Sequence, residues 1–154
     1  MATWQFDLFL IARNEAIPAV SGDGLDLPGM PVQLALEVQQ ALMQVFGPPW
    51  FMLEDWLVFG AEQGTRVDLL FFDDATLEVT LRLHVGIDNG PVVGMVCKLA
   101  RQLDCRLFEP GARCCIEPQP ELVSQAMASS PAASFVSNPR AFLAQLPAGR
   151  QARR

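Results

Sequence analysis

Two stretches on either side of residues 73–74 constrain this fold most, because apolar and polar residues alternate in both. Every second residue is apolar over 66–71 and again over 76–85. A period of two is typical of a β-strand with one buried face and one polar face. Two such strands joined by a short turn predict an antiparallel hairpin. Its polar face is therefore the first place to look for function.

The positions of the apolar residues also predict the register of this hairpin. A two-residue connection would place Asp68 opposite Val79, whereas a three-residue connection at 73–75 gives one uniformly apolar face. Because a slip of one residue moves every side chain to the wrong face, we predict the three-residue connection. It pairs Phe71 with Leu77, Leu69 with Val79 and Val67 with Leu81.

The rest of the chain predicts an α+β fold. Apolar residues recur at helical spacing after Pro31, and Gly47-Pro48-Pro49 ends that helix. Residues 50–55 are ambiguous. Further elements are predicted as strands at 4–11, 56–59, 105–108 and 113–116 and as helices at 31–46, 91–103, 121–127 and 141–146.

This order predicts a two-layer sandwich, with a mostly antiparallel sheet and helices packed on one face. It is a variant of the ferredoxin-like plait with an added strand. We expect one domain over 1–146 and a flexible tail over 147–154. The proline and glycine residues of 16–31 predict a loop without regular structure, and a loop of this length is either mobile or functional.

Charge and composition narrow the class of protein. The net charge of -6 argues against a nucleic-acid-binding protein, which needs a positive field. The beginning of the chain lacks the features of a secretory signal, and no apolar run approaches the ~20 residues of a membrane span. We therefore expect a cytoplasmic protein without membrane contact. Lys98 is the single lysine among 11 basic residues, which indicates a coding bias and a bacterial source.

No sequence motif predicts catalysis, a metal or a cofactor. The four cysteines lack the two-residue gap of zinc and redox motifs, and adjacent Cys114 and Cys115 would point to opposite faces of a strand. We expect buried, reduced thiols. The chain has no G-x-S-x-G elbow, no phosphate-binding lysine loop and no G-x-G-x-x-G motif.

The polar face of the hairpin carries four candidate binding residues, Arg66, Asp68, Arg82 and His84. The predicted register brings Asp68 diagonally within reach of Arg82. We interpret this face mainly as a solvated surface with cross-strand ion pairs. Ligand binding there is the alternative, and catalysis by His84 would require an orienting partner and a pocket.

Aromatic residues concentrate after the Gly47-Pro48-Pro49 segment, and most of these rings are expected in the core. Trp50 and Trp56 are candidate binding residues, because an exposed tryptophan beside a proline-rich loop is a typical interface anchor. Their acidic neighbours Glu54, Asp55 and Glu62 complete the candidate surface, which would suit a basic partner.

Two parts of the chain resemble a known type of protein. Residues 56–85 contain W-x2-F-G-x3-G-T-R-V-D-L and L-x-V-x-L-R-L-H, and residues 130–139 contain S-x-A-x2-F-V-x-N-P. These motifs are similar to those of small uncharacterised bacterial proteins of the toxin-immunity type. The resemblance implies a protein that neutralises a toxin by binding it, and it carries over no active-site residue.

The sequence therefore favours a non-enzymatic bacterial binding module that neutralises a protein partner through an acidic surface. The alternative is a small-molecule-binding protein or enzyme that uses the polar face around Asp68, Arg82 and His84. A homodimer joined through sheet faces or edges is compatible with either function.

Overall fold

An antiparallel sheet of eight strands organises the described part of the chain, which comprises residues 4–21, 24–138, 140 and 144 of this computed structural model. Seven strands follow the order β10-β9-β1-β8-β7-β6-β5, and β4 pairs with β8 beside β1. The strands are β1 (Gln5–Ala12), β4 (Met30–Pro31), β5 (Trp50–Leu53), β6 (Trp56–Gly60), β7 (Arg66–Phe71), β8 (Thr76–His84), β9 (Cys105–Glu109) and β10 (Cys114–Ile116).

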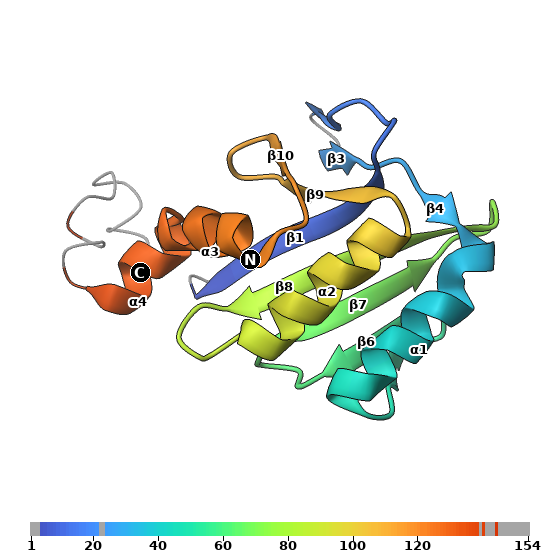
Figure 1. Ribbon diagram of the computed structural model, residues 1–154, viewed down its shortest axis with the longest axis horizontal. Coiled ribbons are helices and arrows are strands. Elements are labelled where there is room, and N and C mark those ends of the chain that lie inside the picture. The colour runs from blue at the N-terminus through green and yellow to red at the C-terminus, as the bar shows by residue number, and fades with distance from the viewer. Residues whose placement is uncertain (1–3, 22–23, 139, 141–143, 145–154) are drawn as a thin grey trace.

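The helices give the predicted two-layer arrangement. Figure 1 shows α1 (Ala35–Phe46) and α2 (Gly90–Gln102) side by side on one face of the sheet. Next to them, α3 (Pro120–Ala128) packs against α2, and α4 (Pro131–Ser137) packs against α3. The α+β sandwich predicted from the sequence is confirmed.

The middle of the sheet has the strand order of a ferredoxin-like plait. There, β9, β1, β8 and β7 are neighbours, α1 lies between β1 and β7 in the chain, and α2 connects β8 to β9. The added strands are more numerous than predicted. The ambiguous residues 50–55 form β5 and its turn, so β5 and β6 extend one edge while β10 extends the other.

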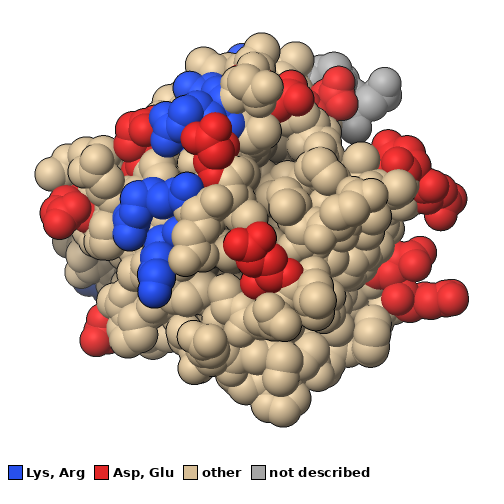
Figure 2. Space-filling view, turned by 45° about the vertical axis from the view of Figure 1, so that its right-hand side comes forward, with Lys and Arg blue, Asp and Glu red and all other residues tan. Residues whose placement is uncertain are grey.

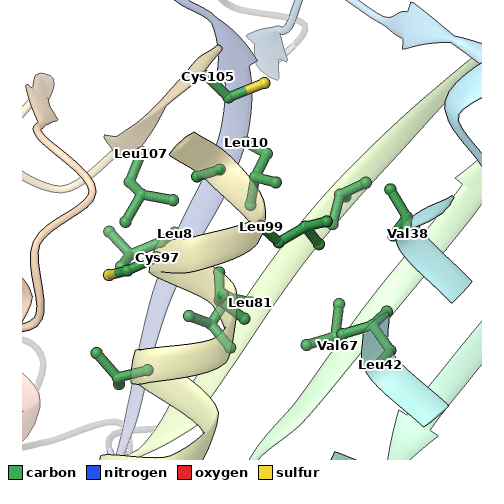
Figure 3. Close-up of a cluster of buried hydrophobic side chains, with 14 of the residues drawn as sticks. Leu8, Leu10, Val38, Leu42, Val67, Leu81, Cys97, Leu99, Cys105 and Leu107 are labelled. Carbon is green, nitrogen blue, oxygen red and sulfur yellow. The ribbon is translucent and has the colours of Figure 1, made fainter. Parts of the chain in front are cut away.

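The predicted register of the central hairpin is confirmed. Phe71 pairs with Leu77, and Leu69 and Val67 pair with Val79 and Leu81. The side chains on this face meet the buried faces of α1 and α2 and form the core, which Figure 3 shows from close by. Members of that core include Leu8, Leu10, Val38, Leu42, Val67, Leu81, Cys97, Leu99, Cys105 and Leu107.

Two sequence-based expectations about the first third of the chain are wrong. The 16–31 segment contains β2 (Ala19–Ser21), paired with β3 (Gly24–Asp26), and then β4. Short antiparallel pairs need few residues, and they tolerate Gly24 at the start of β3 and Pro31 at the end of β4. Pro31 ends β4 in extended conformation and does not begin α1; a 3-10 turn, Val32–Leu34, intervenes.

The end of the chain leaves two predictions untested. The predicted helix 141–146 and the predicted tail 147–154 lie outside the described residues, apart from residue 144. Within the described part of the chain, no helix combines the length and apolar character needed to span a membrane.

Candidate functional site

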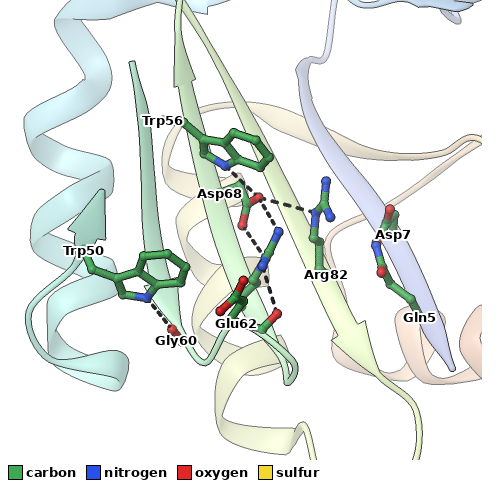
Figure 4. A network of polar contacts seen from close by, with 9 residues as sticks. Gln5, Asp7, Trp50, Trp56, Gly60, Glu62, Asp68 and Arg82 are labelled. Atoms are coloured by element: carbon green, nitrogen blue, oxygen red, sulfur yellow. Dashed lines mark hydrogen bonds and ion pairs between the residues drawn. The ribbon is translucent and has the colours of Figure 1, made fainter. Parts of the chain in front are cut away.

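The sheet face opposite the helices is buried around Asp68, so the expectation of a solvated face is wrong there. The Asp68 side chain is 0% exposed, and Arg66 and Thr80 beside it are buried as well. Large side chains from the same sheet cover this region. The half-buried ring of Trp56 lies next to Asp68 in Figure 4, whereas the half-buried ring of Trp50 lies apart from it, beside Gly60. Alternation correctly predicts which residues share this face, but not that they shield one another from water.

Asp68 is the centre of a network that joins three strands (Figure 4). Its Oδ2 atom accepts hydrogen bonds from Trp56 Nε1 at 2.9 Å and from Arg66 Nη2 at 3.2 Å. Arg66 Nε lies 3.0 Å from Oδ1, and Arg82 Nε lies 3.5 Å from Oδ2. These two ion pairs do not have hydrogen-bond geometry. The ion pair between Asp68 and Arg82 nevertheless confirms the diagonal contact that the sequence predicts.

Arg66 and Arg82 differ in how many of their N–H donors have a hydrogen-bond partner among the described residues. Arg66 is buried, and its Nη1 atom also donates to the Glu62 carbonyl oxygen at 2.9 Å. The Arg82 side chain is 31% exposed and donates no hydrogen bond to any described residue. One fully buried carboxylate thus serves two guanidinium groups, and Arg82 keeps free donors.

Two further carboxyl groups flank Arg82 on the same face. Asp7 is its register partner on β1, and Glu78 lies on β8. Burial raises the pKa of Asp7, against the lowering effects of a 2.7 Å hydrogen bond from Gln5 and of the Arg82 charge. Burial also raises the pKa of Glu78, which Arg82 lowers in part. Neither carboxylate comes within ion-pair distance of Arg82.

A hollow of about 260 Å³ opens beside the two arginines. Its walls include the side chains of Trp4 and Met52 and the polar residues Gln5, Glu62 and Gln63. Of these residues, only Glu62 was part of a surface predicted from the sequence. The hollow is lined by four separate segments, residues 4–5, 52, 62–66 and 82, and no sequence pattern predicts that they meet.

His84 lies outside the Asp68 network. Its ring stacks on Trp4 with centroids 4.6 Å apart, and its Nδ1 atom accepts a hydrogen bond of 3.0 Å from the Gly86 amide. It does not line the hollow. The structure therefore separates His84 from Arg66, Asp68 and Arg82, with which the sequence grouped it, and it brings only Trp56 into their network.

Glu54 and Asp55 belong to a second surface, at one end of the sheet. They form the turn between β5 and β6, and Asp73 and Asp74 lie in the turn between β7 and β8. The two turns are adjacent, because the Phe71 amide donates to the Asp55 carbonyl oxygen at 3.0 Å. All four carboxylates are exposed, and none forms an ion pair with a described basic side chain. Acidic side chains project from the right-hand edge in Figure 2, with no basic side chain among them.

Each of these turns begins with an exposed apolar residue. Leu53, 65% exposed, precedes Glu54, and Phe72, 45% exposed, precedes Asp73. We call the six residues 53–55 and 72–74 the acidic end. The triplets Leu53-Glu54-Asp55 and Phe72-Asp73-Asp74 share one pattern, an apolar residue followed by two acids, and this repeated pattern is the signal in the sequence for the acidic end.

The aromatic residues of this region are only partly where the sequence placed them. Phe59 is in the core as expected, whereas Phe51, on the edge strand β5, is 68% exposed. Trp50 is half-buried, and its Nε1 atom donates to the Gly60 carbonyl oxygen at 2.8 Å. Trp56 is held by Asp68. The exposed aromatic residues near the acidic turns are therefore Phe51 and Phe72, and the two tryptophans hydrogen-bond within the sheet face.

All four cysteines are free, but they are not all buried. Cys97 and Cys105 are buried, whereas Cys114 is exposed and Cys115 is half-buried, because β10 is an edge strand. The described residues hold no group of three or more histidine, cysteine, aspartate or glutamate side chains that could bind a metal ion.

Comparisons of the chain with protein-family models, with curated proteins and with solved structures find no match.

Proposed function

We propose that this protein is a non-enzymatic binding module of the toxin-immunity type, which neutralises a basic protein partner through the acidic end. The observation that carries the proposal is the adjacency of the two turns, each with one exposed apolar residue followed by two exposed acids. Stable interfaces commonly combine apolar anchors with a charged rim. Leu53 and Phe72 supply the anchors, and the four carboxylates supply the rim.

Charge explains why the partner should be basic. Four carboxylates without counter-ions produce a negative potential that attracts a positive surface and repels a negative one. The rest of the chain reinforces that field only slightly, since the net charge of -6 includes these four carboxylates and the other residues carry -2. The resemblance to immunity-type proteins supports the same function. A bacterial source and a cytoplasmic location remain predictions.

The test is capture of a partner from the source organism, or from the products of neighbouring genes, with three forms of the protein. The first is the wild type, and the second carries Glu54→Lys and Asp73→Lys. The third carries Glu37→Lys and Glu121→Lys, which change the net charge equally at exposed positions on α1 and α3.

We expect the wild type and the control to retain the same basic protein, and the acidic-end variant to lose it. Binding should also weaken as salt screens the charges. The proposal fails when the acidic-end variant and the control bind a partner equally well, or when the retained partner is acidic.

Association of two copies is a separate question. Two acidic ends would repel each other, so we expect no homodimer through this end of the sheet. Sedimentation equilibrium at low and high salt measures whether any other face or edge pairs two copies.

Ligand binding on the sheet face around Asp68 and Arg82 is the second candidate function, and the hollow beside Arg82 favours it. This alternative does not need His84, which lies apart from the hollow.

A further inference from the structure

The hollow on the sheet face has unsatisfied positive charge in its wall. Arg66 and Arg82 both line it, and Asp68 is the single carboxylate in ion-pair contact with either of them among the described residues. Arg66 already donates to Asp68 and to the Glu62 carbonyl oxygen. Among the described residues, the Arg82 Nε atom has no hydrogen-bond partner, and its contact with Asp68 is an ion pair of 3.5 Å. Arg82 therefore has donor capacity that the described residues do not use.

Asp68 also fixes where these donors point. It is fully buried and contacts the Nε side of both guanidinium groups, at 3.0 Å for Arg66 and at 3.5 Å for Arg82. Arg82 is held through Nε alone and keeps its terminal nitrogens for another acceptor, whereas both terminal nitrogens of Arg66 already donate to Asp68 and to the Glu62 carbonyl oxygen. Such a planar fork matches the two oxygens of a carboxylate.

The surrounding acids limit how much negative charge a ligand can carry. Asp7 and Glu78 lie on the same face as Arg82, and Glu62 lies at the exposed rim of the hollow. Only Asp68 is within ion-pair distance of the two arginines, and the other three carboxylates stand farther off, so the local charge favours a ligand with one negative charge over a ligand with two. The second negative charge of a phosphate would be repelled by these carboxylates. A monocarboxylate has no second charge and avoids this repulsion.

The remaining walls are mainly polar, with one apolar part. Trp4 and Met52 line the hollow, and amide side chains of Gln5 and Gln63 complete it. A volume of about 260 Å³ lies just below the range of roughly 300–1,000 Å³ that is usual for drug-sized ligands. The Trp4 ring is held in place by its stacking on His84.

We infer that this hollow binds a small monocarboxylic acid with an apolar or aromatic body. Its carboxylate accepts hydrogen bonds from Arg82, and its body packs against Trp4 and Met52. Asp68 is a positioning residue for the two arginines. The inference does not depend on the acidic end, which lies at the turns and does not border the hollow.

Titration with benzoate tests the inference, with tryptophan fluorescence and calorimetry as readouts. Benzamide, which has the same shape without the charge, and inorganic phosphate are the comparison ligands. The variants are Arg82→Gln, Met52→Trp, which fills the hollow but keeps both arginines, and Arg113→Gln, which removes an exposed arginine on the β9–β10 turn.

We expect benzoate to bind the wild type and Arg113→Gln alike, and benzamide to bind at least about tenfold more weakly. Arg82→Gln and Met52→Trp should each weaken benzoate binding by about tenfold or more. No benzoate binding up to about 10 mM, or equal binding by Met52→Trp and the wild type, overturns the site. Tighter binding of phosphate than of benzoate overturns the carboxylate class. Circular dichroism confirms that each variant is folded, and Met52→Trp keeps the test decisive when Arg82→Gln does not fold.

Discussion

Trp56 on β6 donates its indole hydrogen to the Oδ2 atom of Asp68 on β7, over 2.9 Å. Trp56 is the register partner of Leu70, so its ring reaches along the neighbouring strand to a fully buried carboxylate. A hydrogen bond to a buried charge is stronger than one between neutral groups. The large ring of Trp56, which helps to cover this face of the sheet, is therefore held in place by the buried charge of Asp68.

Replacing Trp56 by phenylalanine keeps a large ring but removes the donor. We expect Trp56→Phe to lower the free energy of unfolding by about 1.5–3 kcal/mol. Trp50→Phe is the matched control, because Trp50 donates to the neutral carbonyl oxygen of Gly60. Its cost should be about 0.5–1.5 kcal/mol. Urea denaturation of both variants measures the difference, and equal losses would show that the Asp68 charge adds nothing.

Removing the charge of Asp68 should be more costly. Asp68→Asn leaves Arg66 and Arg82 without a counter-charge on a buried face, and breaking a buried ion pair typically costs about 3–5 kcal/mol. The exposed Asp73→Asn serves as control and should change stability by less than about 0.5 kcal/mol. Similar stabilities for the two variants in urea would mean that water reaches the arginines after all.

Asp7 should have the opposite effect, and its effect should depend on pH. Burial raises the pKa of Asp7 above the ordinary value of 3.8, so the folded protein holds this proton more tightly than the unfolded chain. The resulting stabilisation is complete below pH 3.8 and is lost as the pH rises through the folded-state pKa.

Asp7→Asn keeps an acceptor for Gln5 without the buried charge. We therefore expect it to raise the free energy of unfolding at pH 7, and we expect this gain to disappear below pH 3.8. Denaturation curves recorded between these pH values provide the measurement. A variant less stable than the wild type at pH 7 would show that attraction to Arg82 outweighs the cost of burial.

Gly60 and Gly94 should respond oppositely to alanine. Gly60 has φ +105°, and an added Cβ would lie 2.6 Å from the Thr65 carbonyl oxygen. We expect Gly60→Ala to destabilise the protein by about 1–3 kcal/mol. Gly94 lies within α2, where an added Cβ meets no atom within 4 Å, so Gly94→Ala should stabilise it by about 0.5–1 kcal/mol. Thermal unfolding compares the two variants. A lower stability of Gly94→Ala would contradict the finding that an added Cβ meets no atom there.

The cysteines should react in two separate groups. Burial raises the pKa of Cys97 and of Cys105 to about 11, so almost no thiolate forms at neutral pH. We expect a disulfide reagent to label exposed Cys114 first and half-buried Cys115 next. Cys97 and Cys105 should react only after unfolding. Mass spectrometry of partially labelled protein identifies the sites, and early labelling of Cys97 would indicate local opening of α2.

Local patterns determined much of the fold. The alternation around 73–74 was sufficient to predict the hairpin and its register, because a slip would have placed Asp68 among apolar side chains. Helical spacing predicted α1 and α2, because apolar residues three or four positions apart lie on one face of a helix. The short strands of 16–31 escaped prediction, since pairs of two or three residues leave too few positions to establish a period.

The sequence by itself determined which side chains share the second face of the sheet. Only the tertiary structure decided that Asp68 is buried, that Trp56 and Arg82 meet at one of its oxygens, and that His84 turns to Trp4 instead. The reason is physical. Periodicity specifies the direction in which a side chain leaves its strand, whereas burial and ion pairing depend on the neighbours that other strands bring to it.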